Sequence, residues 1–136
     1  MSSYKIQLVE GIDKATAKKF IEAGVATSEQ LLDTCASPAG RKSFAEKTGV
    51  SEQQILTWTN HADLIRIKGV GPHFAELLEA AGVDTVKEFK MRNAANLYTK
   101  MEEVNKEKKL CGRLPTQAQL QKMIDQASKM PPKMTY

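Results

Sequence analysis

Hydrophobic residues recur three or four positions apart through most of this chain, which is the spacing of an amphipathic helix. Two segments show the pattern most clearly, and their apolar faces are formed by Ile55, Trp58 and Ala62 and by Leu120, Met123 and Ala127. β-Branched residues never alternate with polar ones for more than a few positions, so strands are not expected. The pattern predicts an all-α fold.

Helix starts are indicated by Thr or Ser followed three residues later by Gln or Glu, the spacing of an N-terminal capping box. The four pairs are Thr27 with Gln30, Ser51 with Gln54, Thr85 with Glu88, and Thr116 with Gln119. Ser37 before Pro38 indicates a fifth start, and Gly49 is placed to end that helix. The sequence therefore predicts several short helices joined by short connections.

A glycine-rich turn interrupts the apolar pattern at Gly69-Val70-Gly71-Pro72. The glycines permit positive φ, and Pro72 presets φ for a first helical position. A helix start presents unpaired N–H groups with partial positive charge, which can hold a phosphate. The alternative is that the glycines only allow a tight turn between packed helices. In both cases Gly71→Val is expected to impair folding, because a β-branched residue resists positive φ.

The turn and its surroundings occur twice, 58 residues apart. The equivalent pairs are Gly11 and Gly69, Ala17 and Ala75, Phe20 and Leu78, Gly24 and Gly82, Thr27 and Thr85, and Leu31 and Phe89. Trp58 pairs with Met123 at a larger offset, so about seven residues are added near residues 102–109. This self-similarity predicts a duplication with repeats at 1–62 and 63–130, packed as one compact unit and followed by a tail at 131–136.

Gly69-Val70-Gly71, with Ala75 four residues after the second glycine, resembles the helix-hairpin-helix superfamily. From residue 6 to residue 130 the chain is also similar to a small bacterial family of unknown function built from two such repeats, most clearly at residues 58–64, 80–86 and 113–116. The resemblance implies a tandem, SAM-like helical fold. The wider superfamily implies sequence-independent DNA binding, in which hairpin amides and adjacent basic side chains contact backbone phosphates.

The candidate binding residues follow from this resemblance. In the first turn Asp13 replaces the second glycine, where its carboxylate would cap the helix but repel a phosphate. His73 stands where many superfamily members have lysine. The second turn is therefore the preferred site. The candidates are Arg66, Lys68, Gly69, Val70, Gly71 and His73 from that turn, Lys14 from the first, and Lys106, Lys108, Lys109 and Arg113 from the last third of the chain.

Charge is unevenly distributed along the chain. The net charge is +4, and residues 91–136, with nine basic and four acidic side chains, supply the whole excess. This basic stretch could lie beside the second turn if the added segment folds back on it. Alternatively it is a solubilising surface, since Glu102, Glu103 and Glu107 lie among the lysines. Composition alone favours the second interpretation.

Other functions find little support in the sequence. Cys35 and Cys111 have no metal-type spacing, so two reduced thiols and no zinc are expected. His61 is expected at the surface or at a helix end, and no nucleophile and base are paired, so an enzyme is not expected. The start of the chain lacks an apolar leader, which predicts a cytoplasmic protein. The predicted function is a non-enzymatic accessory module that binds DNA without sequence preference and without a cofactor; the alternative is a protein-interaction scaffold.

Overall fold

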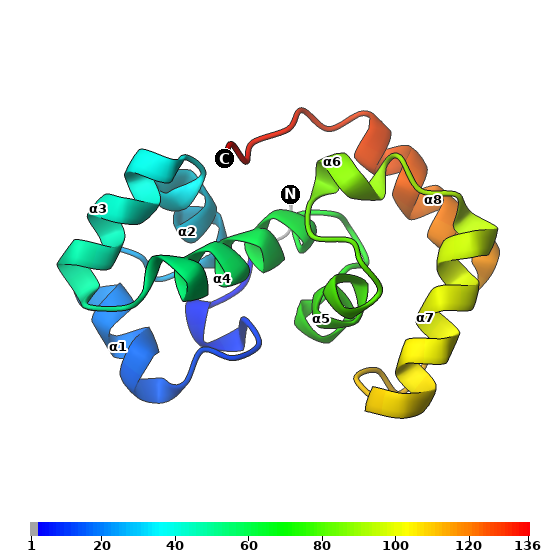
Figure 1. Ribbon diagram of the computed structural model, residues 1–136, viewed down its shortest axis with the longest axis horizontal. Coiled ribbons are helices and arrows are strands. Elements are labelled where there is room, and N and C mark those ends of the chain that lie inside the picture. The colour runs from blue at the N-terminus through cyan, green and yellow to red at the C-terminus, as the bar shows by residue number, and fades with distance from the viewer. Residues whose placement is uncertain (1–2) are drawn as a thin grey trace.

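The computed structural model describes residues 3–136, and this part of the chain is helical, with no named strand. Helix α4 extends between α1–α3 on one side and α5–α8 on the other (Figure 1). The elements are η1 (Ile6–Leu8), α1 (Lys14–Glu22), α2 (Ser28–Cys35), α3 (Pro38–Thr48), α4 (Glu52–Leu64), α5 (Pro72–Ala80), α6 (Val86–Phe89), α7 (Ala94–Lys108) and α8 (Gln117–Ser128). The predicted all-α class is confirmed. Within residues 3–136 no helix combines the length and apolarity needed to cross a membrane.

All five helix starts predicted from the sequence are confirmed by side-chain caps. Each cap oxygen accepts a hydrogen bond from the backbone N–H three residues later, and these caps are Thr27, Ser37, Ser51, Thr85 and Thr116. Only Thr116 and Gln119 form the full reciprocal capping box. The Gln30 and Glu88 side chains instead accept from the amide one residue before the cap, at distances of 2.7 and 3.1 Å.

Two turns separated by 58 residues carry the same backbone hydrogen bonds. In the first, Val9 N–H donates to Ile6 O and Ile12 N–H donates to Val9 O. In the second, the amides of residues 67 and 70 donate to the carbonyls of residues 64 and 67. Gly11 and Gly69 have nearly equal φ angles of 93° and 94°. We call residues 6–13 the first turn and residues 64–71 the second turn.

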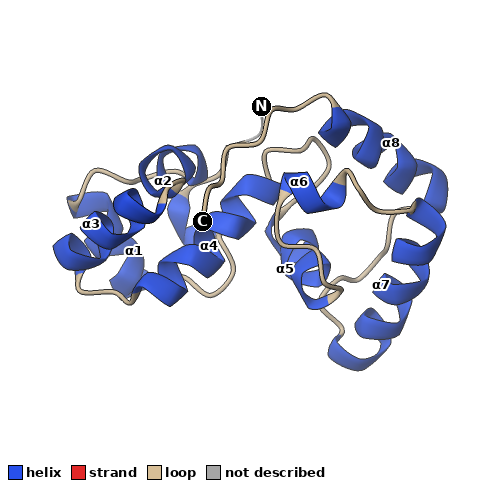
Figure 2. Cartoon of the chain, turned by 45° about the horizontal axis from the view of Figure 1, so that its top comes forward, coloured by secondary structure: helices blue, strands red, loops and turns tan. Residues whose placement is uncertain are grey.

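The buried side chains form one continuous cluster that extends through both groups of helices. On the α1–α3 side, Phe20 packs edge-on against Phe44 and Trp58, with ring centroids 4.9 and 5.8 Å apart. On the other side, α7 and α8 pack together and α5 contacts α7 (Figure 2). The boundary predicted at residues 62 and 63 falls inside α4. The two halves therefore share a helix as well as a core.

In the stretch where the sequence predicts added residues, the structure has a long helix and a loop. Helix α7 has 15 residues, whereas α3 has 11. The following loop starts at Lys109, which adopts a left-handed conformation with φ of 51°. The Asn105 side chain closes this loop with two 2.9 Å hydrogen bonds to the backbone of Cys111.

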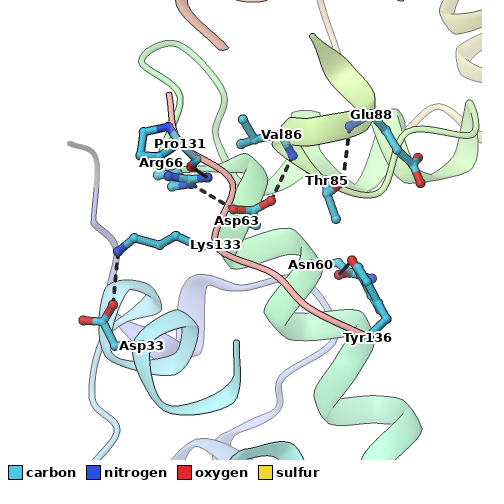
Figure 3. A network of polar contacts seen from close by, with 10 residues as sticks. All are labelled: Asp33, Asn60, Asp63, Arg66, Thr85, Val86, Glu88, Pro131, Lys133 and Tyr136. Atoms are coloured by element: carbon cyan, nitrogen blue, oxygen red, sulfur yellow. Dashed lines mark hydrogen bonds and ion pairs between the residues drawn. The ribbon is translucent and has the colours of Figure 1, made fainter. Parts of the chain in front are cut away.

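The last six residues, predicted only as a tail, return across the molecule to α4 and α2 (Figure 3), and Thr135 N–H donates to Ala36 O between α2 and α3. Pro131 O accepts from Arg66 Nη2 at 2.9 Å. Lys133 Nζ lies 3.2 Å from Asp33 Oδ1, and Tyr136 Oη lies 3.1 Å from Asn60 Oδ1. This segment therefore ties the two groups of helices together at a second place besides α4.

Candidate functional site

The second turn leads into an α-helix that has no side-chain cap. Gly71, the N-cap residue of α5, has extended φ and ψ of −92° and 179° and no side chain to accept a hydrogen bond. Pro72 has no N–H group. Within residues 3–136, the amides of His73 and Phe74 have no acceptor. The start of α5 therefore presents unpaired donors at the positive end of a helix dipole.

The conformation of Gly71 corrects one prediction. Positive φ occurs at Gly69, not at Gly71, because Gly71 has the extended conformation that an N-cap requires. A Cβ atom at Gly71 would have only the Tyr4 hydroxyl within 4 Å, at 3.9 Å. The reason given for damage by Gly71→Val is thus wrong, since extended backbone suits a β-branched residue.

Two predicted binding residues are buried and already bonded. The Val70 side chain is fully buried, and the Val70 amide donates to Ile67 O. Arg66 is 5% exposed, with Nε 2.8 Å from Asp63 Oδ1. The other Asp63 oxygen accepts from Val86 N–H at 2.9 Å (Figure 3). The predictions for Val70 and Arg66 are therefore corrected, because a phosphate could reach neither donor without opening the core.

Three exposed cations lie around the second turn. Lys68 belongs to the turn itself. Arg113, in the loop after α7, lines one hollow with Gly71 and Phe74. Lys122, on α8, lines another hollow with Lys68 and was not predicted. No local sequence signal indicates Lys122, because only the packing of α8 brings it to the second turn.

The other predicted lysines are exposed but line none of the hollows beside the second turn. Lys14 lies in the first turn of α1. Lys106, Lys108 and Lys109 lie at the end of α7, on the same exposed segment as Glu107. These positions fit a solvated, mixed-charge surface as well as they fit an extended binding surface.

Carboxylates adjoin the second turn on the side that faces the first turn. His73 Nδ1 lies 2.9 Å from Glu10 Oε1, so the two turns are neighbours. Burial, followed by the nearby Glu10 carboxyl, raises the pKa of Glu76. The second turn is therefore bordered by cations on its α7–α8 side and by carboxyl groups on its first-turn side.

His61 lies in the last turn of α4, which agrees with the predicted helix end, but it is buried and not at the surface. Its side chain is held between α4 and α5, with Nε2 2.6 Å from Glu79 Oε2. Its Nδ1 atom has no hydrogen-bond partner within residues 3–136. Helical periodicity could have indicated burial, since His61 lies three residues after the buried Trp58 on α4.

Both cysteines are free thiols. Burial raises the pKa of Cys35 to about 11, and burial together with Glu76 raises the pKa of Cys111. No cluster of three or more His, Cys, Asp or Glu side chains suited to a metal ion occurs among residues 3–136. Neither cysteine therefore has the lowered pKa that marks a reactive thiolate.

Together the fold and the site define a small all-α protein organised around two neighbouring glycine turns. A family model described as "Domain of unknown function (DUF4332)" matches residues 10–130, and the chain belongs to this family. No curated protein and no solved structure matches the chain. The predicted membership of a small family of unknown function is thus confirmed, and family membership carries no activity with it.

Proposed function

We propose that this chain is a tandem helix-hairpin-helix module that binds the DNA backbone without sequence preference. In this proposal the repeats correspond to residues 1–62 and 63–130, and the protein is a non-enzymatic accessory or architectural part of a larger assembly. The second turn carries the binding, and the first turn is structural.

The observation that carries the proposal is the start of α5. In residues 3–136 every other α-helix has a side chain that accepts a hydrogen bond from its first turn, including Asp13 at the equivalent position of α1. Helix α5 leaves these donors free, and its start lines one hollow with the exposed Arg113. Lys68 is exposed three residues before Gly71 in the same turn. Free amides at a helix start, with an adjacent cation, are a common arrangement for holding a phosphate.

The distribution of cations supports the same site. Lys68, Lys122 and Arg113 come from three different segments and lie around one turn. Phosphate contacts made by such side chains release counterions, so affinity should fall steeply with salt.

A second candidate is a protein-interaction scaffold in which the turns serve only as connections. The carboxyl groups of Glu10 and Glu76 favour it, because they lie beside His73 and would repel a phosphate approaching from that side. A stoichiometric protein partner that remains bound after nuclease treatment would support this candidate.

Lys68→Glu separates the two candidates. On the DNA proposal the variant loses retention of a short duplex at low salt while its melting temperature stays unchanged, because Lys68 is exposed and its side chain has no ion-pair partner within residues 3–136. Lys42→Glu is the matched control, since Lys42 is equally exposed but lies on α3. Unchanged retention by Lys68→Glu, or no mobility shift with micromolar wild-type protein, would overturn the proposal.

A further inference from the structure

A shallow groove lies between the second turn and α8, and we call it the α8 groove. Its walls are formed by Lys68, Gly69, Gln119, Lys122, Met123 and Gln126. Gln119, Met123 and Gln126 follow one another at intervals of four and three residues, and Lys122 adjoins Met123, so the four residues lie along one side of the helix. Its volume of about 550 Å³ is within the usual range for small-ligand sites, roughly 300–1,000 Å³.

The two glutamines of the α8 groove are held in one orientation. Gln119 Oε1 accepts from Thr116 N–H at 2.8 Å, and Gln126 Oε1 accepts from Lys68 N–H at 3.0 Å. Only the oxygen of an amide side chain can accept from an N–H group, so this assignment follows from the bonds themselves. Within residues 3–136 neither NH2 group has an acceptor.

The side-chain groups of the α8 groove that have no partner within residues 3–136 are therefore donors. Two side-chain NH2 groups are accompanied by the ammonium groups of Lys68 and Lys122, and no carboxylate lines the groove. A complementary ligand must carry acceptor atoms and negative charge. This composition excludes a cationic partner and favours a phosphate ester.

The floor of the α8 groove is apolar. Met123 is half-buried, and its methyl group lies 3.0 Å from the position that a Cβ atom of Gly69 would occupy. Because Gly69 has no side chain, the thioether remains reachable from the groove. A methionine sulfur packs favourably against aromatic rings, by about 0.3–1.5 kcal/mol. A planar, acceptor-bearing ring fits this floor better than a bare phosphate does.

We propose that the α8 groove binds one unpaired nucleotide of a nucleic-acid strand. The phosphate lies between Lys68 and Lys122, the base packs on Met123, and the two glutamine NH2 groups donate to acceptor atoms on the base edge. This inference rests on the proposed function, since Lys68 belongs to both sites. A base within a duplex is stacked on both faces, so reaching Met123 would require unstacking at a cost of a few kcal/mol. The groove therefore favours single-stranded segments.

The test compares labelled oligonucleotides by fluorescence anisotropy: an intact single strand, the same strand with abasic sites, and the corresponding duplex. The wild-type protein should bind the intact strand more tightly than the abasic one. Lys122→Gln should weaken single-strand binding. It should also make the slope of log K against log[salt] less steep by about 0.7, the value for one lost phosphate contact. Lys129→Gln is the matched control, because Lys129 is exposed at the end of α8 and lies outside the groove.

The outcomes distinguish this inference from the proposed function. Equal affinity for the intact and abasic strands, or equal effects of Lys122→Gln and Lys129→Gln, would overturn the groove assignment. If Lys68→Glu still abolished duplex binding in that case, the proposed function would stand alone. Single-strand binding without duplex binding would keep the groove and overturn the duplex proposal. If adenosine monophosphate displaced the strand when both were present at the same concentration of nucleotides, the groove would be a site for free nucleotides. That result would contradict a strand as its ligand.

Discussion

The first and second turns share a backbone and differ in the side chains at their ends. The same amide-to-carbonyl bonds and the same left-handed glycine occur in both turns. In the first turn Asp13 caps α1, and the Lys68 position is taken by Glu10. In the second turn Gly71 leaves α5 uncapped. The comparison shows that two helix starts on the same backbone differ in their free amides and in their charge, and that the residues at these two positions contribute to both differences.

The two turns are also anchored differently. The segment leading into the first turn is held by backbone bonds, from Ile6 N–H to Ala26 O and from Ser28 N–H to Tyr4 O. In the segment leading into the second turn, Val86 N–H donates to the Asp63 carboxylate and not, as Ser28 N–H does in the first, to a backbone carbonyl. The same carboxylate also pairs with Arg66. The second turn therefore depends on a buried charge that the first turn does not have.

The largest effect is expected from Asp63→Ala. This change leaves the Arg66 guanidinium buried without its carboxylate and removes the acceptor of Val86 N–H, so the free energy of unfolding should fall by about 3–5 kcal/mol. Urea denaturation measures this loss. Lys5, at the equivalent position before the first turn, is exposed, and Lys5→Ala should change stability by less than about 0.5 kcal/mol. Similar losses for both variants would contradict the difference in anchoring.

Alanine at the two left-handed glycines should have unequal effects. Both substitutions strain a positive φ by about 1–2 kcal/mol. A Cβ atom at Gly11 would lie 2.9 Å from Nε1 of the rigid Trp58 ring, whereas at Gly69 it would meet the flexible end of Met123. Gly11→Ala should therefore lower the melting temperature more than Gly69→Ala. A larger decrease for Gly69→Ala would show that the packing behind the two turns is not as described.

Gly71→Asp transfers the cap of the first turn to the second. Gly71 and Asp13 share an extended N-cap conformation, so the new carboxylate should accept from the first turn of α5. The gain over glycine should be a few tenths of a kcal/mol, because glycine is itself a tolerated cap. DNA retention should be lost at the same time. Gly71→Asn caps the helix without adding charge, so its affinity for DNA should fall between those of the wild type and Gly71→Asp. If Gly71→Asp retained DNA as well as the wild type does, the α5 start would be excluded as the phosphate site.

The smallest effect concerns pH. The folded protein keeps the Glu76 proton at higher pH than the unfolded chain does, because the pKa of Glu76 is raised by burial and by Glu10. The free energy of unfolding should therefore fall as pH rises from the ordinary glutamate pKa, about 4.3, through the raised value. Glu76→Gln should remove this fall in the free energy of unfolding. The variant should therefore melt at a slightly higher temperature than the wild type at neutral pH, but not at a pH below the ordinary glutamate pKa. An equal change at both pH values would show that Glu76 acts through packing alone.

Local chemistry made much of the fold predictable. A capping residue and its partner are three positions apart, so Thr27, Thr85 and Thr116 could be identified without any tertiary information. The repeated turn was predictable for a similar reason, because a left-handed glycine and its apolar neighbours form a short contiguous pattern.

The site was less predictable, because it depends on contacts between distant segments. Arg66 resembles an exposed cation beside Lys68 until the carbonyl of Pro131, 65 residues away, is seen to accept from it. Lys122 lies far from the second turn in the sequence and reaches it only through the packing of α8. The return of residues 131–136 had no local pattern to reveal it.

The most direct test of the central claim is the salt dependence of duplex binding by the wild type and Lys68→Glu. If the second turn holds the DNA backbone, wild-type affinity should fall by about 0.9 in log K per unit of log[salt] for each phosphate contacted, and binding by Lys68→Glu should be lost. Wild-type affinity that does not change with salt, or the same slope and affinity in Lys68→Glu, would contradict the account.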